Sequence, residues 1–262
     1  MTIDLGSTFA TYRYLAKDMS ATLKAQAKDP QVARETAYFQ ANIAKVKTAD
    51  DLINNYRLFN YAMTAYGLSD MTYAKGFMRK VLDSDLSDKN SFANKLNDQR
   101  FTQFAKMFAF KTLVAATTST QALQQTVMAK YTQQSLEDTA GQSDQGVQLA
   151  LYFKRVAPTI TSAYGLLGDT ALWQVCKTVF GFPDAMANAD ITQQATMVKS
   201  RLNVADLKDP AKVDKLLQRF SVMWDVTNNT ASNPVLALFD SGASQSVSSE
   251  TSAGLLNLKY GG

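Results

Sequence analysis

Apolar residues recur through most of this chain at spacings of three and four residues, which is the pattern of an amphipathic α-helix with one buried face. One such stripe consists of Leu52, Tyr56, Phe59, Met63 and Tyr66. No run of alternating apolar and polar residues lies between hairpin turns, so a β-sheet has little support. We therefore predict an all-α protein.

Residues that favour helix ends stand where these stripes begin and stop. Asp29-Pro30 and Asp209-Pro210 each place a capping carboxylate before a proline, whose missing N–H costs nothing in the first helical turn. Thr48–Asp51 resembles a capping box. Gly67 and Gly181 follow apolar stretches, where a left-handed residue commonly ends a helix. The expected helices are 8–28, 30–47, 49–66, 71–84, 88–108, 119–138, 144–157, 159–168, 169–181, 190–202 and 210–224.

The chain divides by composition into a body and a tail. No Gly- or Pro-rich linker interrupts residues 1–226, so we expect one helical body, an elongated multi-helix bundle. Residues 227–262 are mostly small and polar, interrupted by apolar Val235–Phe239 and Leu255–Leu258. We expect them to form a poorly ordered, low-complexity tail. The alternative is a tail that docks against a partner or against the body.

Two stretches of the body resemble each other. Residues 58–70 and 172–184 share Leu, Thr, Gly and Asp at matching positions, with aromatic residues before the glycine. Similar short motifs follow both in the same order, so residues 49–108 and 169–224 are candidate copies of a three-helix unit. Chance similarity between two ordinary helix ends is the equal alternative.

Composition and charge exclude some classes of protein. Apolar residues make up 46% and charged residues 19%, which suits a folded globule rather than a disordered chain. The net charge is +4, and basic and acidic side chains are interleaved instead of gathered on a basic face. Lys106 and Lys111 flank a group of phenylalanines whose spacing favours core packing. We expect no nucleic-acid partner.

The chain carries neither a membrane-span signal nor a secretion signal. No stretch approaches the ~18 unbroken apolar residues that cross a bilayer. Residues 1–7 lack the basic start and the apolar core of a secretory signal peptide. We therefore expect synthesis in the cytoplasm, without a cleaved signal peptide and without a membrane span.

The absence of histidine is the strongest chemical observation in the sequence. It removes Ser-His-Asp and Cys-His catalysis, and it removes most zinc, haem and non-haem iron sites. The single cysteine, Cys176, lies in an apolar helical stretch and is expected to be a core residue instead of a reactive thiol. No glycine-rich phosphate loop occurs. We predict no catalytic, cofactor-binding or metal-binding residues and no enzymatic activity.

One acidic cluster, Asp83–Asp88, begins like a calcium-binding loop, with oxygen-bearing residues at positions 1, 3 and 5. It then departs from that pattern, because Asp88 stands where the sharp turn requires glycine and Asn94 stands where a bidentate glutamate is expected. We interpret the cluster as a turn between helices that ends in a capping residue.

Several longer motifs resemble a known family, the bacterial domain of unknown function 1217. The motifs are Asp51-Leu52, Tyr56-Arg57-Leu58-Phe59, Ala65-Tyr66-Gly67-Leu68, Lys80-Val81-Leu82, Ser91–Arg100, Leu149–Phe153, Ala157-Pro158 and Asp206–Pro210. The resemblance covers most of the chain up to about Asp225. Members of this family occur in alphaproteobacteria and are commonly encoded among flagellar basal-body and motor genes.

The resemblance implies no catalytic residues and no established ligand. It does mark four charged motif members, Arg57, Lys80, Asp98 and Arg100, as candidate interaction residues. They are either partners in buried ion pairs or parts of an interaction face.

These observations favour a non-enzymatic structural or interaction protein associated with the flagellum, whose partner is a flagellar protein and which is exported through the flagellar apparatus or remains inside the cell. A cytoplasmic, chaperone-like adaptor for a flagellar subunit is the first alternative. A small-molecule binder with a charged pocket is the second, and it requires Arg57, Lys80 and Asp98 to converge in a polar cleft.

Overall fold

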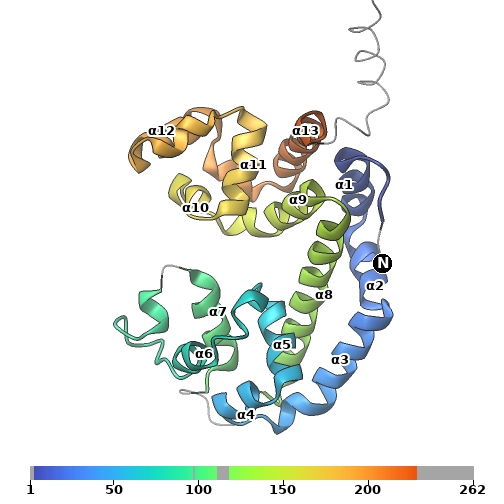
Figure 1. Ribbon diagram of the computed structural model, residues 1–262, viewed down its shortest axis with the longest axis vertical. Helices are drawn as coiled ribbons and strands as arrows, with labels where there is room; N and C mark the ends of the chain where they lie inside the picture. Colours follow the sequence, from blue (N-terminus) through green and yellow to red (C-terminus); the bar gives the residue numbers. More distant parts are fainter. Residues whose placement is uncertain (1–2, 97, 111–117, 229–262) are drawn as a thin grey trace, which may run out of the picture. The chain divides into compact units, whose positions relative to one another are not determined.

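The computed structural model describes residues 3–96, 98–110 and 118–228 (Figure 1). Among these residues every regular element is a helix, so the predicted all-α class is confirmed. The α-helices are α1 (Thr8–Lys17), α2 (Met19–Ala27), α3 (Pro30–Asn42), α4 (Ala49–Asn54), α5 (Tyr56–Ala65), α6 (Lys75–Leu82), α7 (Gln99–Phe108), α8 (Gln121–Ser143), α9 (Gln145–Val156), α10 (Ala163–Leu167), α11 (Thr170–Phe180), α12 (Ile191–Arg201) and α13 (Pro210–Asn228). Short 3₁₀ helices connect several of them, at Ile43–Lys45, Ser69–Met71, Ala93–Lys95, Ala157–Thr159, Asp184–Asn188 and Val204–Lys208.

The predicted helix caps are present. Asp29 accepts hydrogen bonds from the backbone of Gln31 and Val32 at the start of α3. Thr48–Asp51 forms a reciprocal capping box at α4. Gly67 and Gly181 have positive φ angles of 66° and 65°, which side chains with a Cβ atom disfavour.

Three expected helices are divided or begin far later than predicted, and capping side chains explain two of these errors. Shifts of four or five residues also occur at the end of α3, the start of α6, the end of α8, the start of α10 and the end of α13. The expected helix 8–28 is divided between α1 and α2, because the Asp18 carboxylate accepts from the backbone N–H of Ala21 and starts a new helix. Asn55 divides 49–66 into α4 and α5 in the same way. The expected helix 88–108 begins only at Gln99, since the residues before it form turns and a 3₁₀ helix.

The helices form two compact units. Of the described residues, Ile3 and those between 15 and 143 belong to unit 1, and residues 4–14 and 144–228 belong to unit 2. The chain passes between the units within α1 and again between α8 and α9. The absence of a Gly- or Pro-rich linker suggested a single helical body. The two units are instead joined by a helix, α1, and by the one residue between α8 and α9, and neither connection needs such a linker. Of the predicted tail, 227–262, the first two residues belong to the last turn of α13, and the rest lies outside the described residues.

Unit 1 is organised around the long helix α8, which packs against α2, α3 and α5. Three aromatic rings stack across these helices: Phe39 of α3 on Tyr61 of α5 at 4.5 Å, and Tyr61 on Tyr131 of α8 at 3.8 Å between centroids. The helix α6 closes the other side of the core by packing against α4 and α7. Four members of the expected apolar stripe are buried, with Leu52, Phe59 and Met63 wholly inaccessible to solvent. The fifth, Tyr56, is 64% exposed, because the helix break at Asn55 interrupts the period on which the stripe was predicted.

Unit 2 is organised around α9, which packs against α11 and α13. Residues 4–14 are held by buried polar groups of the same unit. The carboxylate of Asp225 in α13 accepts hydrogen bonds from the backbone N–H groups of Thr8 and Phe9, at 2.8 and 3.0 Å. The Thr8 hydroxyl donates to Asp144, the N-cap of α9, at 2.6 Å. One buried network therefore caps α1 and ties it to both neighbouring helices.

The order of elements is similar in the two candidate repeat copies. In each, a helix ending in a left-handed glycine (α5 and α11) is followed by a 3₁₀ turn, a helix (α6 and α12), a second 3₁₀ turn and a third helix (α7 and α13). Asp98 and Asp209 lie at equivalent places, just before α7 and α13. The internal duplication remains a prediction.

Candidate functional site

The four charged motif residues lie in three separate places of unit 1. Arg57, in the first turn of α5, forms two hydrogen bonds with the Glu35 carboxylate of α3, at 2.7 and 3.2 Å, and its guanidinium lies 4.0 Å from the ring centroid of Tyr38. The Arg57 guanidinium holds the pKa of the Glu35 carboxyl below its usual range. This partly exposed pair joins α3 to α5, and Arg57 lines neither of the two hollows described below.

Asp98 and Arg100 pair with each other. Asp98 is the N-cap of α7, and its carboxylate accepts from the backbone N–H and from the guanidinium of Arg100, the latter at 2.7 Å. Burial raises the pKa of the Asp98 carboxyl, but the hydrogen bonds from Arg100 outweigh it, so that the pKa lies below its usual range. Arg100 also donates to the carbonyl of Gly67, the left-handed residue after α5. The pair therefore fixes the start of α7 against the end of α5.

Lys80 lies on α6 beside a shallow polar depression of about 430 Å³. Its ammonium group is 6.0 Å from the ring centroid of Phe92. The depression also contains the acidic cluster Asp83–Asp88, which forms local turns: Asp85 accepts from Ser87, and Asp88 accepts from the backbone N–H of Asn90. This geometry agrees with a turn between helices, although Asp88 caps no helix, since α7 begins at Gln99. Within the described ranges no group of three or more acidic or sulfur ligands is arranged to hold a metal ion.

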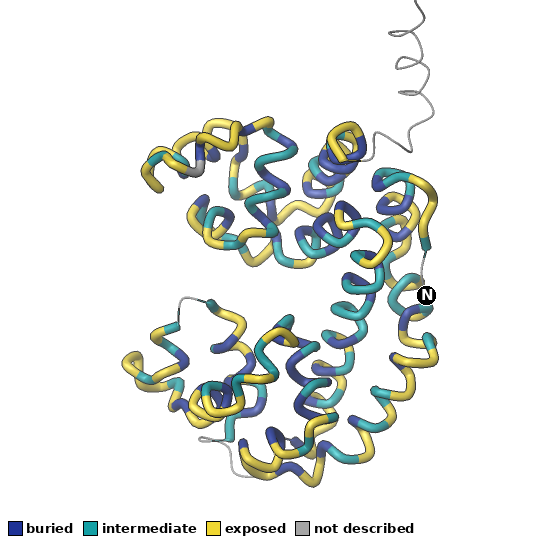
Figure 2. The backbone as a smooth tube through the Cα atoms, in the orientation of Figure 1, coloured by how far each residue is buried: buried dark blue, intermediate teal, exposed yellow. Residues whose placement is uncertain are grey.

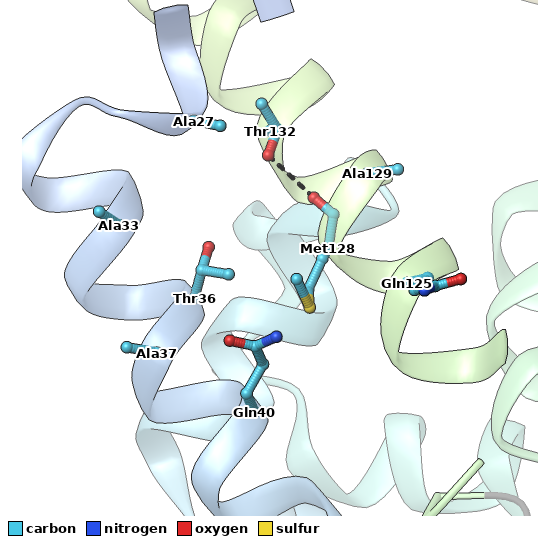
Figure 3. A pocket seen from close by; sticks show the side chains of 9 residues that line it. All are labelled: Ala27, Ala33, Thr36, Ala37, Gln40, Gln125, Met128, Ala129 and Thr132. Atoms are coloured by element: carbon cyan, nitrogen blue, oxygen red, sulfur yellow. Dashed lines mark hydrogen bonds between the residues drawn. The ribbon is translucent and has the colours of Figure 1, made fainter. Parts of the chain in front are cut away.

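A groove in unit 1 runs between α3 and α8, with the end of α2 beside it (Figure 3). Figure 3 shows Thr36 and Gln40 of α3 pointing toward Met128 of α8. The volume is about 300 Å³, and none of the nine lining side chains is charged. The lining consists of Ala27, Ala33, Thr36, Ala37, Gln40, Gln125, Met128, Ala129 and Thr132.

The groove offers no group suited to acid–base or nucleophilic chemistry. The Thr132 hydroxyl donates to the Met128 carbonyl at 3.0 Å, and the Thr36 hydroxyl shares a hydrogen bond with Tyr61 at 3.0 Å. Most of the lining residues are exposed, so that a small molecule placed there would remain largely in solvent. Small side chains on two neighbouring helices do allow the close approach of a third helix.

No motif in the sequence indicates this groove. Its lining is made of alanine, threonine and glutamine, which carry no chemical signal of their own. The sequence feature that could have pointed to the groove is a four-residue spacing. It separates Ala33 from Ala37 on one predicted helix and Gln125 from Ala129 on another. That spacing places uncharged residues on one face of each helix, but it does not show that the two faces meet.

The thiol of Cys176 is wholly buried in α11, as expected for a core residue. Burial raises the pKa of this thiol to about 12. At pH 8 only about one molecule in 10⁴ would then carry the reactive thiolate, against roughly a quarter of free cysteine molecules. We expect a disulfide reagent such as Ellman's reagent to leave the native protein unmodified while the denatured protein reacts within minutes. Reaction of the native protein at the rate of free cysteine would contradict this burial.

The described helices and their local ion pairs define an all-α protein of two compact units, in which no described helix is long and apolar enough to cross a membrane. The family model described as "Protein of unknown function (DUF1217)" matches residues 65–213. The chain belongs to this family.

A solved relative supports the same fold. The chain is similar to the crystal structure of protein AGR_C_984 from Agrobacterium tumefaciens, with 46% sequence identity and a TM-score of 0.76. The match covers 87% of this chain and 97% of that one. No curated protein matches the sequence.

Proposed function

We propose that this chain is a non-enzymatic, flagellum-associated protein that binds the uncharged face of a partner helix in the groove between α3 and α8. The proposal rests on the composition of that groove, because its nine lining residues include no titratable side chain. A charged helix face would lose solvation there without gaining an opposite charge, so an uncharged face is the occupant that the lining fits. A helix laid along small side chains buries apolar area without an acid, base or nucleophile.

The placement of the charged motif residues gives further support. Arg57 is engaged with Glu35, and Asp98 with Arg100, so these charges hold α3, α5 and α7 together. A small-molecule site of the kind considered from the sequence needs these groups in one cleft, and they lie in separate places. We therefore assign Arg57 the role of holding α3, one wall of the groove, against α5. Asp98 and Arg100 hold the start of α7 against the end of α5.

The flagellar part of the proposal rests on the family resemblance alone, which implies that the gene lies among flagellar basal-body and motor genes. A clean deletion of the gene is expected to reduce swimming or filament assembly, and the full-length gene in trans is expected to restore it. Normal swimming of the deletion strain in soft agar, with filaments of normal number and length, would contradict the proposal.

A chaperone-like adaptor is the alternative that the same groove favours, because an adaptor also holds a client helix. An adaptor and a structural component differ in where the protein is found and in how many flagellar proteins the deletion affects. An adaptor remains in the cytoplasm, and its deletion lowers the export of one client. A structural component is found in purified basal bodies or filaments, where an antibody against the chain would detect it.

A further inference from the structure

A second surface, on α13 of unit 2, carries a narrow stripe of cationic and apolar residues. Lys215, Arg219, Val222 and Val226 follow one another at spacings of four, three and four residues, which places them on one line along the helix. Val222 and Val226 are 46% and 50% exposed, and Lys215 and Arg219 are also exposed. The stripe extends over about 16 Å of helix.

The opposite face of α13 is the one that packs within unit 2. Val213, Leu217, Phe220 and Trp224 are buried there against α9 and α11. Figure 2 shows buried and exposed positions on the successive turns of this helix. The stripe is therefore not required for the core, and its two β-branched residues lower helix propensity without contributing to packing.

The cations of the stripe lack the ion pairs that three other lysines of unit 2 form. Lys177 pairs with Asp184 at 2.7 Å, Lys212 pairs with Asp206 at 2.6 Å, and Lys154 pairs with Asp214. Within the described part of the chain, no ion pair or hydrogen bond involves the side chain of Lys215 or Arg219. Two unengaged cations thus lie one helical turn apart, directly followed by two exposed aliphatic residues.

We propose that this stripe binds an acidic amphipathic helix of a protein partner, at a surface separate from the groove of unit 1. Two carboxylates of the partner pair with Lys215 and Arg219, and two aliphatic side chains cover Val222 and Val226. Charge complementarity fixes the register, and burial of the valines supplies affinity. The charged and apolar positions are separated along α13, so the partner helix carries its carboxylates about two turns from its aliphatic pair.

The arrangement fits a protein better than the other anionic ligands. Nucleic acid is typically bound through several phosphate contacts, and this stripe offers two cations. A helix that lies on a membrane separates its charged and apolar groups around its circumference and uses large apolar side chains. Here both kinds of residue share one line, and the apolar members are valines.

A photo-crosslinking amino acid placed at Val222 of the full chain tests the proposal in the organism that encodes it. The expected adduct contains a protein segment with the acidic and aliphatic spacing given above, identified by mass spectrometry. The same amino acid at Gln193, an exposed position of α12, is the control site. The double substitution Lys215→Glu and Arg219→Glu is expected to reduce the adduct at least tenfold. The matched reversal of Arg201 and Lys208, exposed cations away from the stripe, is expected to leave it unchanged.

A charge exchange decides between specific docking and simple proximity. Lysine in place of the partner's two carboxylates is expected to restore the adduct with the Lys215→Glu and Arg219→Glu chain. The proposal is overturned by an adduct that charge reversal does not change, or by one with lipid, nucleic acid or residues 229–262 of this chain. The absence of any adduct at Val222 and Val226 in swimming cells overturns it as well. Normal swimming after deletion of the gene would refute the flagellar role, but it would not change the crosslinking result expected at Val222.

Discussion

Substitution of Gly146 by alanine is expected to destabilise unit 2 by about 1–3 kcal/mol, as an overpacked core does. A Cβ atom at this position of α9 would overlap Cδ1 of the buried Trp224, and it would lie 2.6 Å from Nε1 of Trp224 and 2.7 Å from Cγ2 of Thr8. The clash outweighs the helix propensity that alanine would add, which is about 1 kcal/mol. Thr8 and Trp224 belong to the segments that α9 holds together, so the strain would spread to α1 and α13.

Tryptophan fluorescence can follow this unfolding selectively, because Trp173 and Trp224 are the two tryptophans of the chain and both belong to unit 2. Gly165→Ala in α10 is the matched control. The nearest atoms to its added Cβ belong to Ile160 at 3.5 and 3.6 Å, which is ordinary contact. We expect this control to be neutral or stabilising by up to about 1 kcal/mol. Equal effects of the two substitutions on the fluorescence-detected unfolding free energy would contradict the packing around Gly146.

Substitution of Asp225 by alanine is the second change with a large expected effect, a loss of about 2–4 kcal/mol from unit 2. The Asp225 side chain accepts two backbone hydrogen bonds at the start of α1, and the residue is only 6% exposed. Its removal leaves two N–H groups without their charged acceptor in a place that water reaches poorly.

Asp190→Ala is the control for this prediction. Asp190 also caps a helix, with a hydrogen bond of 2.7 Å from the backbone of Thr192, but it is exposed and water can replace it. Its loss is expected to cost about 1 kcal/mol. The comparison uses urea unfolding followed by the same tryptophan fluorescence. An Asp225→Ala protein no less stable than Asp190→Ala would show that the N-terminal segment is not held by this carboxylate.

Local features of the fold were predictable from the sequence because they depend on neighbouring residues. The cap at Asp29, the capping box of Thr48–Asp51 and the left-handed Gly181 all lie within one helical turn of the groups they serve. The breaks at Asp18 and Asn55 were missed because the apolar period continues across them. The hydrogen bond from Thr8 to Asp225 joins residues 217 positions apart, and no local pattern indicates such a pair.

The candidate sites were less predictable for a related reason. Charge drew attention to Arg57, Asp98 and Arg100, whose partners turned out to be nearby groups that stabilise helix packing. The groove is built from residues such as Ala37 and Ala129, which attract no notice individually. A docking surface of this kind becomes visible only when the packing of two helices is known.

The central claim, that the groove between α3 and α8 binds an uncharged helix face, is tested most directly by adding charge without changing shape. Gln40→Glu with Gln125→Glu places one carboxylate on each wall, and Gln31→Glu with Gln121→Glu adds the same charges at exposed positions of the same helices outside the lining. Each pair is introduced into the deletion strain, and swimming in soft agar is measured beside the thermal stability of the purified chain. We expect both proteins to be as stable as the unmodified chain, and only the groove pair to leave swimming as poor as in the deletion strain. Full restoration of swimming by the groove pair would contradict the claim.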